Sequence, residues 1–468
     1  MYIRPPAVAG RFYPESPQKL QFAVSALLEE ALPAHSEAPV ALIAPHAGYL
    51  FSGQIAADAF KQAHGHLYDL VVIFGTNHTS RRLDHIALPS SSAFATPLGN
   101  TTIPRNLVAE LLRDIPECIE DDHPHEFEHS IEVQIPFLQQ VAPDVPILPM
   151  IVGLGSPKRC HDFGMKLAVQ LDDRRVLYVA SSDLSHYPTK EMAERLDKEV
   201  IQGIISLDSS RLNSVFQNHP AVNGEAILTR ACGSGPINAL IGVASALGCS
   251  QGVEISYANS GDTLFGEDER VVGYGAIAFY KGAEIAAVKS QPDKPLGPSL
   301  IQLARRSLEM YLGGDVTPLP RGFSKEGLAQ RGAFVTLYNG KKLRGCVGHI
   351  TSDEPLCLTV GKMALAAASK DWRFPPVTYK EIQNLIIEVS VLTEPELIAG
   401  IDEIEPGRDG VMIRKGGRKG VFLPKVAEEQ GWDKEELLEH LCDKADLPRG
   451  SWRKGAELLT FQAEIYKE

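Results

Sequence analysis

The first 280 residues alternate between short apolar runs and stretches with helical spacing. Apolar runs bounded by turn residues predict strands, and apolar positions recurring every three to four residues predict helices. The expected strands span residues 40–44, 70–74, 147–152, 176–180 and 253–257. The expected helices span residues 54–63, 130–140, 190–205 and 237–247. Such alternation indicates an α/β sandwich around a largely parallel or mixed sheet.

A stretch rich in proline and glycine interrupts this pattern after residue 280. Beyond it, the spacing predicts helices over 300–312, 355–368 and 434–444, and strands over 333–338, 385–392 and 411–413. This second pattern is typical of a smaller α+β domain. A chain of 468 residues also exceeds the roughly 250–300 residues that one core serves. We therefore expect one domain over residues 1–283, a linker over 284–297 and a second domain over 298–468.

The composition narrows the classes of protein and partner. Hydrophobic residues make up 44% and charged residues 22%, which is typical of globular proteins. The net charge of -13 repels phosphate backbones, so we expect no nucleic-acid partner. No long apolar run predicts a signal peptide or a membrane span, and we expect a cytoplasmic protein without a membrane partner. The seven cysteines form no CxxC pair, and no motif predicts a nucleotide cofactor.

Residues that bind metals follow several expected strands. His46 follows the first strand, His78 the second, and Asp183 and His186 the fourth. Because ligand sites of open α/β sheets lie beyond the carboxyl ends of strands, these loops should share one edge. Cys232 begins a helical stretch, where a helix N-terminus would lower the pKa of a thiol. Together these residues predict a metal site, although any single loop histidine is weak support.

A second pattern competes with this site. His125, Glu126 and His129 match H-E-x-x-H, in which two histidines on one helical face bind zinc. Pro136 lies seven residues after His129 and would shorten or kink the helix that a zinc hydrolase needs. We favour a polar helix start, with Glu128 and His129 near the cleft, over the zinc site.

The first domain resembles the Memo family in six ordered segments. They are 9–14 (AGRFYP), 43–49 (IAPHAGY), 75–78 (GTNH), 128–134 (EHSIEVQ), 181–186 (SSDLSH) and 232–233 (CG). The resemblance implies a fold similar to class III extradiol dioxygenases. It also implies one iron(II) or copper ion per chain, bound by His46, His78 and Cys232. His186 would be the acid/base, with Asp183 beside it.

The resemblance also defines the surroundings of that site and its chemistry. Tyr49, Glu128 and His129 are the expected cleft residues around the metal. A thiolate replaces the carboxylate of the 2-His-1-carboxylate triad, which makes the site softer and favours copper(I) as well as iron(II). We expect a metal-dependent, dioxygenase-like oxidoreductase that acts on a small molecule. A non-catalytic metal-binding scaffold or carrier is the first alternative, and a zinc-dependent hydrolase is the second.

The second domain resembles the AMMECR1 family in six segments. They are 332–337 (GAFVTL), 343–348 (LRGCVG), 371–374 (DWRF), 388–393 (EVSVLT), 422–424 (FLP) and 431–433 (GWD). Both families occur beside a radical-SAM protein, which implies such a partner for this chain. Arg344, Cys346, Asp371 and Arg373 are the candidate site residues here. A tight strand end with a small buried cysteine is the competing interpretation of Cys346.

A basic cluster spans residues 414–419 (RKGGRK). Its central glycines predict the tip of a β-hairpin. On an acidic protein, we interpret this cluster as a solvated turn and not as a nucleic-acid site.

Overall fold

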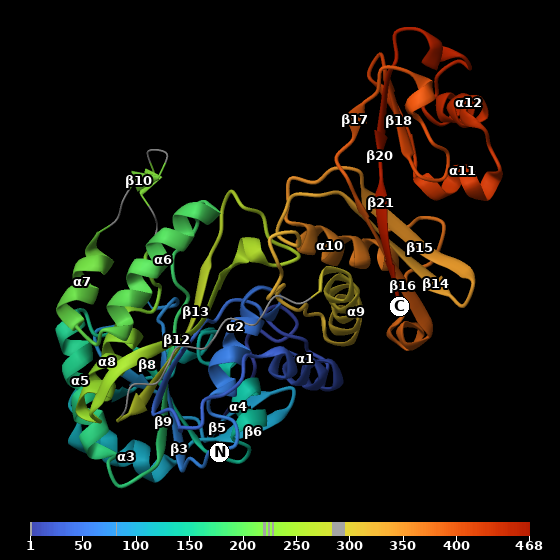
Figure 1. Cartoon of the computed structure of the whole chain (residues 1–468). Coiled ribbons are helices and arrows are strands. Elements are labelled where there is room, and N and C mark those ends of the chain that lie inside the picture. The colour runs from blue at the N-terminus through green and yellow to red at the C-terminus, as the bar shows by residue number, and fades with distance from the viewer. Residues whose placement is uncertain (1, 81, 219–220, 223–224, 227–228, 283–294) are drawn as a thin grey trace. The chain divides into compact units, whose positions relative to one another are not determined.

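Figure 1 shows the computed structural model, which describes residues 2–80, 82–218, 221–222, 225–226, 229–282 and 295–468. The chain divides into one unit of residues 1–290 with 313–319, and another of residues 291–312 with 320–468. Most of the expected linker, residues 284–294, lies outside the described residues, and its boundaries stay a prediction. Among the described residues, no helix combines the length and apolar composition that a bilayer crossing requires.

The N-terminal unit contains the following elements. Its strands are β1 (Ile3–Arg4), β2 (Ala41–Ala44), β3 (Leu70–Gly75), β4 (Ile86–Leu88), β5 (Ala93–Thr96), β6 (Gly99–Thr102), β7 (Cys118–Glu120), β8 (Ile147–Val152), β9 (Val176–Ser181), β10 (Ala221–Val222), β11 (Glu225–Ala226), β12 (Cys249–Asn259) and β13 (Gly273–Lys281). Its α-helices are α1 (Pro17–Glu30), α2 (Tyr49–Lys61), α3 (Arg105–Asp114), α4 (Ile135–Val141), α5 (Pro157–Gln170), α6 (Lys190–Ile205), α7 (Ser209–Gln217) and α8 (Ser234–Ala246).

An eight-stranded mixed sheet forms the centre of this unit, in the order β12-β13-β2-β9-β3-β8-β4-β7. The four strands β2, β9, β3 and β8 are parallel neighbours and are buried along their whole length. Helices α1, α2 and α4 pack together, and α5 packs on α8, so that helices cover both faces of the sheet (Figure 1). The expected α/β sandwich is confirmed. Strands buried on both faces explain why their sequences are continuously apolar.

One helix differs from the sequence expectation. The helix expected over residues 130–140 is a short 3-10 turn, Glu132–Gln134, followed by α4 from Ile135. Pro136 occupies the first turn of α4, where its missing N–H costs no hydrogen bond. The polar segment before it is therefore a loop, and this loop carries Glu128 and His129 to the carboxyl edge of the sheet.

Helices α5 and α8 approach each other at two glycines. A Cβ atom on Gly164 would collide with the carbonyl oxygen of Ala239, and a Cβ atom on Gly242 with that of His161. Backbone atoms cannot move aside as a flexible side chain can. This contact brings α8 against the sheet and thereby positions the segment that begins at Cys232.

We expect Gly242→Ala to lower the free energy of unfolding by about 3 kcal/mol, the upper part of the usual range for overpacking. Gly155→Ala is the matched control, because its nearest neighbour would be Asp84 Oδ1 at 3.6 Å. Denaturant titration of both variants measures the difference. Equal, small effects would mean that the two helices separate without cost.

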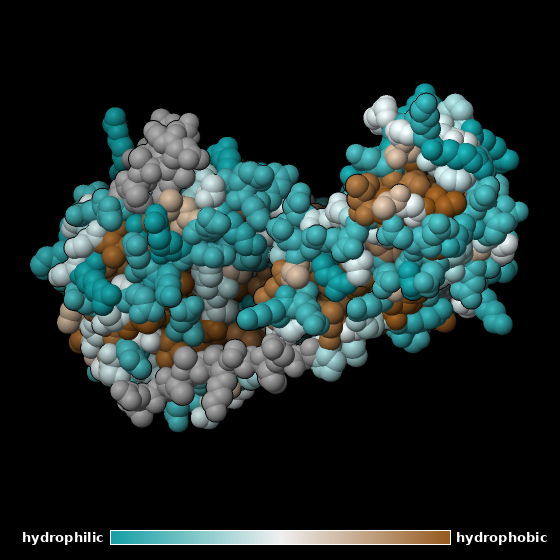
Figure 2. Space-filling view, turned by 45° about the horizontal axis from the view of Figure 1, so that its top comes forward, coloured by the Kyte–Doolittle hydropathy of each residue, from teal (hydrophilic) through white to brown (hydrophobic). Residues whose placement is uncertain are grey.

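The C-terminal unit contains two four-stranded sheets, β15-β14-β16-β21 and β17-β20-β18-β19. Its strands are β14 (Ala333–Asn339), β15 (Lys342–His349), β16 (Leu385–Leu392), β17 (Glu396–Leu397), β18 (Gly410–Lys415), β19 (Arg418–Phe422), β20 (Glu457–Phe461) and β21 (Ala463–Lys467). Its α-helices are α9 (Leu296–Gly314), α10 (Leu356–Ser369), α11 (Pro424–Gln430) and α12 (Lys434–Lys444). The expected α+β class is confirmed. Figure 2 shows a largely hydrophilic surface on the face that it presents, with apolar side chains gathered in local patches.

Candidate metal centre

Three neighbouring parallel strands bring the predicted residues together. His46 follows β2, Asp183 follows β9, and His78 follows β3, while β9 pairs with both of the other strands. The carboxyl ends of parallel neighbours meet at one edge, as the sequence predicted. Cys232 reaches the same place just before α8, which packs on β9 and β3.

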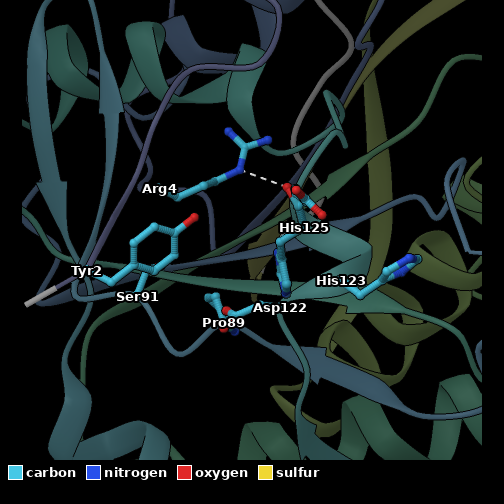
Figure 3. Close-up of a pocket in the computed structure, with 8 residues that line it drawn as sticks. Tyr2, Arg4, Pro89, Ser91, Asp122, His123 and His125 are labelled. Atoms are coloured by element: carbon cyan, nitrogen blue, oxygen red, sulfur yellow. Dashed lines mark hydrogen bonds between the residues drawn. The ribbon is translucent and has the colours of Figure 1, made fainter.

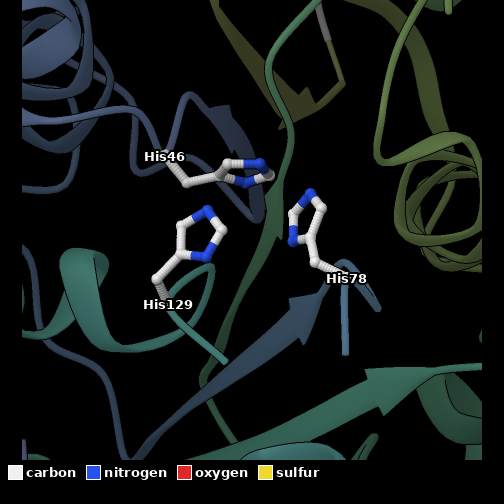
Figure 4. A group of neighbouring side chains, drawn as sticks. All are labelled: His46, His78 and His129. Atoms are coloured by element: carbon white, nitrogen blue, oxygen red, sulfur yellow. The ribbon is translucent and has the colours of Figure 1, made fainter. Parts of the chain in front are cut away.

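His46, His78 and His129 form a group that could hold a metal ion. One ligand atom from each lies within 4.8 Å of the others. Figure 4 shows the three imidazole rings facing a common point. The ring centroids of His46 and His78 are 5.1 Å apart, and those of His78 and His129 are 4.7 Å apart. His129, expected only as a cleft residue, thus lies as close to this point as the two predicted ligands.

Hydrogen bonds fix the proton on the His46 ring. The Ser181 hydroxyl donates to the carbonyl oxygen of Ser130 at 2.6 Å and accepts from Gln134 Nε2 at 2.9 Å. The 2.9 Å contact between His46 Nδ1 and Ser181 Oγ therefore has Nδ1 as the donor. A neutral ring with its proton on Nδ1 has a free lone pair on Nε2, which is the atom that faces Cys232.

Glu128 does the same for His78. Its Oε1 lies 3.0 Å from His78 Nδ1, and its Oε2 accepts the backbone N–H of His78 at 2.8 Å. Glu128 is 2% exposed and also accepts the backbone N–H groups of His129 and Ser130. A carboxylate that orients a histidine in this way is a frequent companion of metal ligands. The sequence pointed to Glu128 only as a cleft residue.

Burial keeps the imidazoles of His46 and His129 neutral. Burial and the neighbouring His78 lower the pKa of His46 to about 3. Burial and the charge of His46 lower the pKa of His129 to about 4. Neutral rings can donate a lone pair without first losing a proton, so this environment suits metal binding at neutral pH.

Cys232 lies against the histidine group. Its Sγ is 3.1 Å from His46 Nε2 and accepts the backbone N–H of Asp183 at 3.3 Å. The helix N-terminus was expected to lower the pKa of this thiol, and that expectation is wrong. Burial and the neighbouring Asp183 raise it well above its ordinary value. A bound cation would have to displace the thiol proton.

Asp183 and His186 differ from the expected arrangement. Asp183 is 4% exposed, and its Oδ1 accepts the backbone N–H of His46 at 2.7 Å. Among the described residues, no hydrogen bond joins its carboxylate to His186. His186 Nε2 is buried and has no hydrogen-bond partner within the described part of the chain. Asp183 therefore holds the His46 loop, whereas His186 Nε2 stays buried without a partner among the described residues.

Two other residues support the site from a distance. Tyr49, an expected cleft residue, donates its hydroxyl to the carbonyl of Val133 at 2.7 Å and packs against Phe137. It supports α2 and not the metal group. Glu132, which sequence reasoning missed, is fully buried and pairs with Arg4 at 2.5 Å. This pair ties the N-terminal segment to the loop that carries His129.

The H-E-x-x-H residues do not form a zinc site in the structure. His125 ends a 3-10 turn, His123–His125, and its buried Nε2 lies 3.0 Å from the carbonyl oxygen of Ala87. With Tyr2 and Arg4 it lines a separate cavity of about 310 Å³ (Figure 3). His129 belongs instead to the histidine group. The two histidines thus lack the shared helical face on which a zinc hydrolase depends.

The C-terminal candidates separate into two groups. The backbone N–H of Cys346 donates to Asp371 Oδ2 at 2.8 Å, and Arg373 Nη2 donates to the same oxygen at 2.7 Å. The Arg373 hydrogen bonds outweigh desolvation and hold the pKa of Asp371 well below its ordinary value. Arg344 instead donates to Glu381 Oε1 at 3.0 Å. The structure thus brings Cys346, Asp371 and Arg373 together, and it directs Arg344 elsewhere.

Known proteins are similar to each part of the chain. A MEMO1 family protein of Methanosarcina mazei is 36% identical over 281 residues, covering 59% of this chain and 99% of that protein. Protein MJ0810 of Methanocaldococcus jannaschii is 41% identical over 184 residues, covering 37% of this chain and 90% of that protein. The crystal structure of uncharacterized protein PH0010 from Pyrococcus horikoshii is 42% identical with a TM-score of 0.35, covering 37% of this chain and 91% of that one.

The family descriptions divide the chain in the same order as the sequence motifs. The description "Memo-like protein" matches residues 4–278, which include all three histidines of the candidate centre and Cys232. The description "AMMECR1" matches residues 301–466. The chain therefore belongs to the Memo-like family and carries an AMMECR1 domain after its Memo domain.

Proposed function

We propose that the Memo domain is a metal-dependent oxidoreductase whose single iron(II) or copper ion is bound by His46, His78 and Cys232. The observation that carries this proposal is the fixed proton on each ring. Ser181 and Glu128 accept the Nδ1 protons of His46 and His78, so the lone pair of each ring lies on Nε2 at the carboxyl edge of the sheet.

One pair of the proposed donors, His46 and Cys232, has a spacing that suits an ion of this class, although Cys232 is not part of the 4.8 Å group of His46, His78 and His129. Two ligands of a tetrahedral ion at metal distances of about 2.0–2.3 Å lie roughly 3.5 Å from each other. The 3.1 Å between His46 Nε2 and Cys232 Sγ is close to that spacing. Two imidazoles with a thiolate favour iron, copper or zinc over magnesium or calcium. His129, the third member of the histidine group, would be a further ligand or would face a substrate.

When bound, the ion would supply Lewis-acid and redox chemistry. The chain itself would supply orientation and proton transfer. His186 would hold or release a proton at Nε2, the ring nitrogen without a partner among the described residues. Asp183 would fix the His46 loop through the backbone N–H of that residue. A small-molecule substrate and a radical-SAM partner are part of the same proposal.

Metal analysis of protein purified without oxygen tests the proposal. We expect one first-row transition ion per chain, and its loss in His46→Ala. His125→Ala should keep the ion, because that ring lies in the separate cavity. A site emptied by His125→Ala and retained in His46→Ala would favour the zinc hydrolase instead.

Glu128→Gln should weaken metal affinity by about 10- to 100-fold, the usual effect of losing a partner that orients a ligand. Gln keeps the size of Glu128, but its amide has a single acceptor oxygen. It therefore cannot accept all the hydrogen bonds that the two carboxylate oxygens accept from His78, His129 and Ser130. Glu126→Gln is the matched control, since Glu126 lines the separate cavity. Competition with a chelator of known affinity measures both variants. An unchanged affinity in Glu128→Gln would remove this residue from the account.

A further inference from the structure

The basic cluster of residues 414–419 is divided between two faces of a hairpin. In the antiparallel pair of β18 and β19, Arg414 lies opposite Lys419, and Lys415 lies opposite Arg418. Opposite residues share a face, and successive residues alternate between faces. The four cations therefore form two pairs on opposite sides of the same two strands.

The pair nearer the turn already has partners within the protein. Lys415 Nζ donates to the carbonyl oxygens of Ser451 at 2.9 Å and Lys454 at 2.7 Å. Arg418 forms an ion pair with Asp446, 3.3 Å between Nη1 and Oδ2. This side of the hairpin is the side of Val411 and Ile413, which pack into a core with α12. Its charges thus have a structural role.

The other pair lines a cavity of about 390 Å³. His349, at the end of β15, and Lys444, the last residue of α12, also line it. Among the described residues that line this cavity, none carries a carboxylate, and none in the described part of the chain forms an ion pair with Arg414 or Lys419. Glu457 lies directly opposite Arg414 on β20 and forms no ion pair among the described residues, whereas Asp443 is engaged by Arg449 and Asp446 by Arg418.

Like charges placed directly opposite on two strands destabilise a sheet, and the exposed Glu457 on the other side of Arg414 offsets only part of the two positive charges. The same face continues into the pair Met412 and Val421, which line the cavity together with Ile350. Met412 is 6% exposed. The cavity thus has a cationic end and an apolar wall, and its volume is within the usual range of small-molecule sites.

We propose that this cavity binds a phosphorylated organic molecule. Arg414 and Lys419 bind the phosphate group, to which guanidinium and ammonium groups donate charge-assisted hydrogen bonds, whereas Lys444 Nζ lies over the Phe422 ring, 4.4 Å from its centroid. The organic group packs against Ile350, Met412 and Val421. The site is independent of the metal centre, because it lies wholly within the C-terminal unit.

Isothermal titration of the full-length, metal-free protein with phenyl phosphate tests this proposal. The double variant Arg414→Gln/Lys419→Gln should weaken binding by about 10- to 100-fold, as expected for two lost charged hydrogen bonds. Lys415→Gln/Arg418→Gln removes the same charge from the opposite face and should stay within about twofold of the unchanged protein. Inorganic phosphate should bind more weakly than phenyl phosphate, and benzoate should bind more weakly still.

Three results would overturn the proposal. The first is no binding of phenyl phosphate to the unchanged protein at millimolar concentration. The second is an equal loss in the two double variants, since general charge attraction would explain it. The third is tighter binding of a thymidine oligonucleotide than of phenyl phosphate through Arg414 and Lys419, which would identify a nucleic-acid site. Thermal unfolding of each variant separates lost binding from lost folding.

Discussion

Replacing His186 by glutamine is expected to leave the metal in place and slow turnover by roughly 10²–10⁴-fold, the usual contribution of a positioned proton-transfer group. The His186 ring is close enough to the centre for its charge to affect the pKa of His46. Its Nε2 is buried without a partner among the described residues. Glutamine preserves polarity and approximate size but cannot exchange a proton. The variant should therefore lower the turnover rate and leave metal binding unchanged.

The assay begins with oxygen uptake by the iron- or copper-loaded protein, tested with phenolic compounds and with radical-SAM products. His123→Gln is the control, because His123 is exposed and lines the separate cavity. Full activity in His186→Gln would remove the acid/base role, and loss of metal would make His186 a ligand. Metal binding without turnover in the unchanged protein, with every partner present, would favour the scaffold.

Asp183→Asn should act differently from the sequence expectation. The sequence placed Asp183 beside His186 as its orienting group. In the structure its carboxylate accepts the backbone N–H of His46. The variant should therefore reduce metal affinity together with the rate, and not the rate alone.

Glu132→Ala is expected to lower the free energy of unfolding by about 3–5 kcal/mol, the usual cost of breaking a buried ion pair from one side. Side-chain exposure is 3% for Arg4 and zero for Glu132. Glu132 also accepts the backbone N–H groups of Ala7 and Val8 and the hydroxyl of Tyr13. Its removal leaves the Arg4 charge and these donors without their partner.

Urea unfolding of Glu132→Ala, compared with the double variant Arg4→Met/Glu132→Leu, checks this expectation. The double variant should be more stable than Glu132→Ala, because it leaves no uncompensated buried charge. A loss below about 1 kcal/mol in Glu132→Ala would mean that water reaches Arg4 and replaces the carboxylate.

The sequence predicted the part of the site that depends on strand order. His46 and His78 follow buried apolar strands, and the carboxyl ends of such strands meet wherever they pair. The position of His129 depends on an irregular loop between β7 and α4, for which periodicity carries no signal. Glu128 was the sequence signal that pointed to this loop, since an acid beside a histidine near the cleft is typical of a residue that orients a ligand.

In the AMMECR1 domain, too, the sequence pattern did not predict which charged residues contact each other. Arg344 and Cys346 were expected in one candidate site together with Asp371 and Arg373. Arg344 instead pairs with Glu381. Residues 414–419 were interpreted as one solvated turn, and the hairpin itself is confirmed by the β18–β19 pairing. Strand alternation could have divided its charges between two faces, but the cavity on one face depends on β15 and α12.

Cobalt(II) binding tests the central claim most directly, because a thiolate ligand gives cobalt a sulfur-to-metal charge-transfer band in the near ultraviolet. A centre of His46, His78 and Cys232 predicts this band in the unchanged protein, its loss in Cys232→Ser and its retention in His129→Gln. The expected result is one cobalt ion per chain with that pattern. A band absent from the unchanged protein, or unaltered in Cys232→Ser, would contradict the account and leave the three-histidine group as the metal site.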